Sequence, residues 1–205
     1  RAAGHLRRAD VLDRALDGGD TAGQVGRLHA PVPVAVLAEA EVHAIANPLI
    51  NITLQGRHDT YPKRRGQTRV PEMRGYGINV AFGHDCVMDP WYSMGSGDML
   101  EVASMGLHVG QMTSREAMRY AFDCVTTHPA KIMGLEGYGV DKGCKADFVL
   151  PQARDTIEAI RLKATRLAVV RAGKVISETP PRVAALSLPG RPDTVDPADY
   201  APGGN

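Results

Sequence analysis

An acidic residue follows a short apolar run in the segment GINVAFGHDCVMDPW, residues 77–91. The run 78–82 is typical of a buried strand, and it ends at Gly83, His84 and Asp85. In a barrel of parallel strands, catalytic side chains lie at the carboxyl ends of the strands. A carboxylate at Asp85 could therefore bind a divalent metal or take a proton from a metal-bound water. The plainer alternative is that Asp85 forms a turn, because aspartate is common where a strand gives way to a loop.

The neighbours of Asp85 have alternative roles as well. In an extended backbone the side chain of His84 points away from that of Asp85, so we interpret His84 as a packed or supporting residue. Trp91 either lines a pocket or packs the loop. The basic run 63–65 is more typical of a solvated surface than of a phosphate site.

The elements around Asp85 alternate between extended and helical patterns. A strand is expected within 42–50, ending at Asn47-Pro48, and a long polar loop within 51–67, a length typical of functional loops. The strand 78–85 would follow, and together these segments form the α/β unit of a parallel sheet. Short helices are expected at 34–41, 70–77, 98–112, 114–127 and 129–137.

After Gly139 the pattern becomes extended. Short strands are expected within 145–153, 164–179 and 183–190, with a hairpin turn at 171–174. Residues 187–205 are expected to be a disordered tail, and residues 1–36 predict no clear element.

The composition is that of an ordinary globular protein, with 43% hydrophobic and 23% charged residues and a net charge of +1 among 205 residues. We therefore expect no nucleic-acid or membrane partner, and no apolar run approaches the roughly 18 residues that span a bilayer. Cys86, Cys124 and Cys144 are widely separated, which favours reduced thiols in the cytoplasm over disulfides or a structural zinc site.

From about residue 37 to residue 179 the chain resembles the bacterial cytosine deaminases of the amidohydrolase superfamily. Three segments carry the resemblance: 46–66, 77–109 and 135–150. It implies a (β/α)8 barrel with one divalent metal, iron or zinc, and a β-sandwich built from both chain ends. Asp85 matches the metal ligand on the last strand, which also accepts a proton from the attacking water. Trp91 matches an aromatic residue near the substrate, and Cys86 a position beside the pyrimidine that is often Asp.

The same resemblance implies that only part of a barrel is present. It identifies 42–50 and 78–85 as strands seven and eight, so the fold class would be α/β, a partial barrel with part of a small β-sandwich domain. The expected domains are 37–138 for the barrel portion and 139–186 for the β-sandwich portion. Residues 1–36 are unassigned, either disordered or translated from a different reading frame or fused. The histidine ligands and the catalytic Glu would be absent.

The implied reaction is the hydrolysis of cytosine to uracil and ammonia by the intact enzyme, a cytoplasmic homo-oligomer. We predict that this chain alone is inactive. The alternatives are an amidohydrolase that acts on another aminated heterocycle, such as a triazine or isoguanine, and a non-catalytic remnant. Two barrel strands would also leave an unpaired apolar sheet edge, which predicts poor solubility or dependence on a partner.

Overall fold

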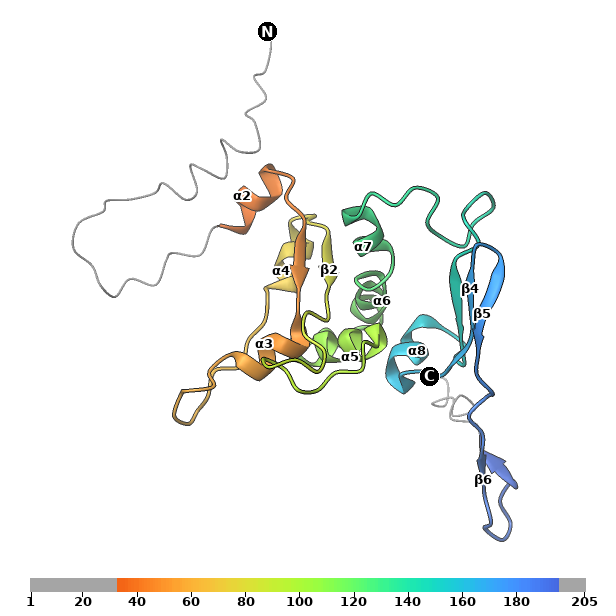
Figure 1. Cartoon of the computed structure of the whole chain (residues 1–205). Helices are drawn as coiled ribbons and strands as arrows, with labels where there is room; N and C mark the ends of the chain where they lie inside the picture. Colours follow the sequence, from red (N-terminus) through yellow and green to blue (C-terminus); the bar gives the residue numbers. More distant parts are fainter. Residues whose placement is uncertain (1–32, 196–205) are drawn as a thin grey trace, which may run out of the picture.

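The computed structural model describes residues 33–195 (Figure 1). Its first part contains a pair of strands and six helices: α2 (Val34–Glu39), β1 (Ala44–Ala46), α3 (Pro48–Leu54), α4 (Val70–Gly75), β2 (Val80–Phe82), α5 (Met99–Val109), α6 (Arg115–Asp123) and α7 (Thr127–Ile132). Its second part is mostly extended: β3 (Phe148–Pro151), α8 (Thr156–Leu162), β4 (Arg166–Arg171), β5 (Lys174–Glu178), β6 (Ala184–Ala185) and β7 (Thr194–Val195). Within residues 33–195, no helix has the length and apolarity needed to cross a bilayer.

The two strands of the first part pair in parallel, as predicted. Ala44 lies opposite Val80 and Ala46 opposite Phe82, so both strands end at the same edge of the pair. The helices α3 and α4 connect them (Figure 1). This strand–helix–helix–strand unit brings residues that follow β1 close to residues that follow β2.

The prediction of a loop over 51–67 is wrong at its beginning, because α3 extends to Leu54. Pro48 occupies the first turn of α3, where its missing N–H costs no helical hydrogen bond. Leu49 and Ile50 are buried, so the helix has an apolar side despite the polar residues that follow. The Asn-Pro pair, which we expected to end the preceding strand, is the start of this helix.

The core of the first part is centred on β2. All three residues of β2 are buried, and Phe82 is only 2% exposed. The ring of Phe82 lies against Gly106 of α5, where an added Cβ would come within 2.5 Å of a ring carbon. The absence of a side chain at Gly106 therefore allows α5 to pack closely on β2.

The outer edge of β2, the edge away from β1, is covered by the segment that joins α6 to α7. The N–H of Phe82 donates to the carbonyl oxygen of Cys124 at 2.7 Å. Nδ1 of His128 lies 2.8 Å from the carbonyl oxygen of Val80 and must be the donor, because a carbonyl only accepts. The expectation of an unpaired sheet edge is therefore wrong for β2. Within residues 33–195 it holds for β1, whose Ile45 is 57% exposed.

Two predicted helices differ in how well their ends were placed. Ser114 caps α6 and accepts a hydrogen bond from the N–H of Ala117, as its sequence pattern predicts. The next helix, α7, begins at Thr127 rather than Pro129 and ends at Ile132 rather than Gly137. Gly134 follows with a φ of 61°, a left-handed conformation that ends helices.

The second part contains an antiparallel sheet in the order β3–β4–β5. The predicted hairpin joins β4 to β5 through Ala172 and Gly173, both with positive φ, as in the tight turns that favour glycine. We predicted no helix at 156–162, where α8 lies between the helices of the first part and this sheet (Figure 1). Its cap, Asp155, accepts from the N–H of Glu158.

The predicted terminal segments are described only in part. Residues 184–185 pair with 194–195 as β6 and β7, so ordered structure continues past residue 187, where we placed the start of a disordered tail. At the other end, α2 begins at Val34, inside the unassigned segment 1–36. The predictions for 1–32 and 196–205 lie outside the described residues.

Candidate active site

Asp85 lies three residues beyond Phe82, at the carboxyl end of the parallel strands. It is exposed, and its φ is 66°. Few residues other than glycine adopt this left-handed conformation, although aspartate is among those that tolerate it. The position agrees with the expectation that chemistry in such a sheet is located at the ends of its strands.

Both carboxylate oxygens of Asp85 accept hydrogen bonds from side chains. Nδ2 of Asn47, the residue that follows β1, donates to Oδ2 at 3.0 Å. Sγ of Cys86 donates to Oδ1 at 3.3 Å. The carboxylate is therefore oriented by one donor from each of the two strand ends.

Gly83 makes room for the bond between Asn47 and Asp85. A Cβ added at Gly83 would lie 2.3 Å from Oδ1 of Asn47, far inside van der Waals contact. The amide of Asn47 thus packs directly on the backbone of Gly83 on its way to Asp85. Sequence reasoning missed this role of Gly83, and it placed Asn47 only at the end of the strand within 42–50.

His84 is buried, which confirms its interpretation as a packed residue. Its Nδ1 lies 2.9 Å from the carbonyl oxygen of Cys86 and therefore donates. Nε2 is buried without a hydrogen-bond partner among residues 33–195. Gly95 faces the ring so closely that a Cβ there would lie 2.5 Å from Cε1. His84 therefore packs inside the loop that follows β2, whereas Asp85 is exposed.

Cys86 is a thiol held between two carboxylates. A hydrogen bond to Asp89, burial and the nearby Asp85 together raise the pKa of the Cys86 thiol to about 12. The thiol is therefore protonated at neutral pH and acts as a donor. The pKa of Asp89 is lowered, mainly by the same hydrogen bond with Cys86 and to a smaller extent by the hydrogen bond from the backbone N–H of Tyr92.

The structure places Trp91 and Tyr92 differently. Trp91 is 68% exposed, while Tyr92 is buried and packs into the core. Asp89 fixes both residues, because its Oδ1 accepts from the N–H of Trp91 at 2.9 Å and from the N–H of Tyr92 at 3.0 Å. Tyr92 is therefore the residue that packs the loop after β2 onto the core, and the indole of Trp91 is exposed to solvent.

A complete metal site is not present in the described part of the chain. Among residues 33–195, no three His, Cys, Asp or Glu side chains lie close enough together to hold a metal ion. Asp85 supplies one suitable ligand, and each of its oxygens already accepts a hydrogen bond. These residues alone do not fit the implied iron or zinc site, and any further ligands would come from outside them.

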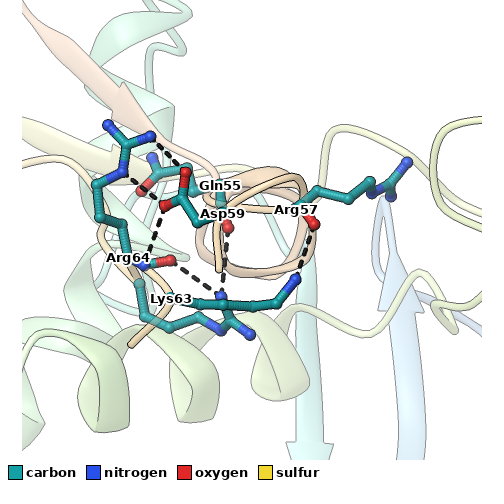
Figure 2. A network of polar contacts seen from close by, with 6 residues as sticks. Gln55, Arg57, Asp59, Lys63 and Arg64 are labelled. Carbon is teal, nitrogen blue, oxygen red and sulfur yellow. Dashed lines mark hydrogen bonds and ion pairs between the residues drawn. The ribbon is translucent and has the colours of Figure 1, made fainter. Parts of the chain in front are cut away.

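The loop 55–65, which follows α3, is held together by its own basic residues (Figure 2). Arg64 pairs with the carboxylate of Asp59 through two nitrogens, at 2.6 and 2.7 Å. Lys63 Nζ donates to the carbonyl oxygen of Arg57 at 2.8 Å, and Arg65 donates to that of Arg64 at 3.0 Å. The basic run 63–65 is therefore largely exposed to solvent, as predicted, and its side chains also hold the loop together.

The loop 55–65 should lose order in acid. The Arg64 guanidinium lowers the pKa of Asp59 to about 2, from an ordinary value of 3.8. Since the folded pKa is depressed, the pairing stabilises the loop above pH 4 and is lost as the pH falls through about 2. We expect the backbone amide resonances of Gly56 and Arg64 to shift together between these limits. In Arg64→Gln the midpoint should return towards 3.8, and an unchanged midpoint would contradict the role of the pair.

A parallel strand pair with an oriented carboxylate at its carboxyl end, flanked by helices and joined to a small antiparallel sheet, is an α/β arrangement of the kind that TIM-barrel-type proteins contain. The sequence model of the amidohydrolase family matches residues 8–177, and the chain belongs to this family. The match includes residues 8–36. A different reading frame for that segment stays a prediction.

Three relatives make the resemblance more specific. A pterin deaminase of Rhizobium rhizogenes is 32% identical over 84% of this chain and 41% of its own length. The crystal structure of 5-methylcytosine deaminase from Klebsiella pneumoniae, liganded with 5-fluorocytosine, is 36% identical, with a TM-score of 0.70 over 77% of this chain and 38% of that one. N-isopropylammelide isopropylaminohydrolase from Burkholderia multivorans is 29% identical, with a TM-score of 0.60 over 71% and 34%. The chain thus spans less than half the length of these relatives.

Proposed function

We propose that this chain carries part of the active site of an enzyme that hydrolytically deaminates an aminated nitrogen heterocycle. The observation that carries the proposal is the Asp85 carboxylate, exposed at the carboxyl end of two parallel strands and oriented by Asn47 and Cys86. Similarity to a 5-methylcytosine deaminase and to a pterin deaminase supports this class of reaction.

In the proposed reaction, water adds to the ring carbon that bears the amino group. Water supplies the oxygen of the new carbonyl and two protons, one for the ring nitrogen and one for the amino group, which leaves as ammonia. Asp85 takes a proton from the attacking water, a role that suits an exposed carboxylate with free lone pairs. Because Asn47 and Cys86 each use one lone-pair site, the carboxylate keeps acceptor capacity for this proton.

The proposed substrate is cytosine, converted to uracil, or a pyrimidine closely related to it. Identity of 36% with a 5-methylcytosine deaminase supports this choice. Cys86 favours an alternative substrate. The resemblance implies that this position is often Asp, and a protonated thiol does not accept hydrogen bonds from a substrate as an Asp carboxylate does. A heterocycle with a different pattern of donors, such as a pterin or a triazine, is therefore the second candidate. Trp91, with its outward indole, is proposed as a contact to the ring.

We further propose that β1 and β2 are the last two strands of a (β/α)8 barrel and that β3 to β5 belong to its small β-sandwich. Closing this barrel would require its first strand to displace Cys124 and His128 from the outer edge of β2. The remaining site residues would then lie on polypeptide outside residues 33–195. The rival view, a non-catalytic remnant, predicts that no added polypeptide restores activity.

Complementation tests the proposal. The purified chain would be mixed with the part of the Rhizobium relative that it does not span, in the presence of Fe²⁺ or Zn²⁺, and ammonia release measured from cytosine, a pterin and an aminotriazine. We expect release from the mixture and none from either polypeptide alone. Release from no substrate would favour the remnant, and release that is unaffected by Asp85→Asn would overturn the role of Asp85.

A further inference from the structure

We propose that Asn47 is a positioning residue that fixes the orientation of the Asp85 carboxylate before any substrate binds. This inference rests on the proposed function, because it assigns Asn47 a role in the same site. The direct observation is the bond from Nδ2 of Asn47 to Oδ2 of Asp85, 3.0 Å long, between residues 38 positions apart in the sequence. It joins the end of β1 to the end of β2.

The local structure would favour a different use of this side chain. Asn47 is the N-cap of α3, a position where asparagine ordinarily accepts a hydrogen bond from the first turn of the helix. Asp98, Ser114 and Asp155 do so at the starts of α5, α6 and α8. Among the described residues, no backbone N–H donates to the side chain of Asn47. Asn47 therefore forgoes a stabilising cap and holds Asp85 instead.

Two further features agree with this assignment. The amide of Asn47 occupies the space where a side chain at position 83 would lie, so the contact with Asp85 depends on glycine at that position. Asp85 adopts a φ of 66°, a conformation that costs free energy for a residue with a side chain and that a firm hold on its carboxylate offsets.

Cys86 does not make Asn47 redundant. A thiol is a weaker donor than an amide, and its sulfur lies 3.3 Å from Oδ1, the other carboxylate oxygen. Cys86 is also adjacent to Asp85 in the chain, so it moves with it. Asn47 belongs to a different strand and ties the carboxylate to the sheet.

The alternative is that the hydrogen bond between Asn47 and Asp85 is only structural and holds the ends of β1 and β2 together. The variant Asn47→Ser separates the two readings, because serine can cap α3 yet is too short to reach Asp85. Asn47→Ala removes both possibilities. Asn51→Ala, on the same helix and also half-buried, is the matched control.

The experiment measures how fast each carboxylate of the whole chain is labelled by a carbodiimide and an amine, with peptide mass spectrometry, beside thermal unfolding by circular dichroism. We expect Asn47→Ser and Asn47→Ala to raise the labelling rate of Asp85 about fivefold relative to Asp98, the factor expected for one lost hydrogen bond. Asn51→Ala should leave it unchanged. The Tm of Asn47→Ser should equal or exceed that of the native chain.

Side-chain amide NMR gives an independent signature, since the Asn47 NH₂ resonances should move in Asp85→Ala and stay in place in Asp89→Ala. Asp85 labelling that is unchanged in Asn47→Ser, or raised only in variants with a lowered Tm, would overturn the proposal. The experiment contains neither metal nor substrate. Its failure would therefore leave the deamination proposal to the complementation assay, and failure of that assay would leave this contact measurable.

Discussion

Replacing Phe82 by alanine is expected to lower the free energy of unfolding by about 3–5 kcal/mol, the range for removing a buried aromatic ring. Phe82 is 2% exposed at the centre of the core around β2, and its ring packs on α5. Since small domains have a total stability of only about 5–15 kcal/mol, the loss should move the urea midpoint strongly. Far-UV circular dichroism suits the measurement, because Trp91 is 68% exposed and would report unfolding poorly by fluorescence.

Gly106→Ala provides a control that tests the packing itself. Alanine is normally about 1 kcal/mol better than glycine inside a helix. Here its Cβ would lie 2.5 Å from the Phe82 ring, so we expect a net loss of stability in the native background. In Phe82→Ala the ring is gone and the same substitution should stabilise. Equal effects in the two backgrounds would contradict direct contact between these residues.

Asp85→Asn is expected to reduce ammonia release in the complementation mixture by about 10²- to 10⁴-fold, the usual contribution of a positioned proton acceptor. The amide keeps the size of the carboxylate but cannot take a proton from water at neutral pH. Initial rates of ammonia release would be compared at saturating substrate. Because Asp85 is exposed, the Tm of the chain should change little.

Asp193→Asn is the matched control for this substitution. It makes the same change of charge at an exposed residue between β6 and β7. We expect full activity from it. Equal rates for Asp85→Asn and the native chain would remove Asp85 from the chemistry, whereas equal losses in both variants would indicate a general effect of charge.

The predicted elements that proved correct have strong local signals. The apolar run of β2, the Ser114 cap of α6 and the turn at Ala172-Gly173 each follow from a few neighbouring residues. Two helices, α3 and α8, were not predicted although each has a local start signal, Pro48 in the first turn of α3 and the Asp155 cap of α8. Asn47-Pro48 is as typical of a turn as of a helix start, and α8 is a short helix between strands, placed by packing on α5 and α6.

The candidate site divides in the same way. Asp85 is visible in the sequence because an apolar run stops just before it. Its contact with Asn47 depends on the parallel register that sets Ala46 opposite Phe82, and no local pattern contains that register. The role of Gly83 cannot be predicted from its neighbours in the sequence either, because the side chain that packs on it is Asn47, which follows the other strand.

The covered edge of β2 limits how molecules of this chain can join through the parallel sheet. Endless polymerisation by strand addition needs two open edges on each molecule. In the described part of the chain, Cys124 and His128 use the outward groups of Phe82 and Val80, so only the side of β1 near Ile45 can receive another strand without breaking these bonds. With a single receptive side, strand addition through this sheet ends at a pair of molecules instead of growing into a fibre.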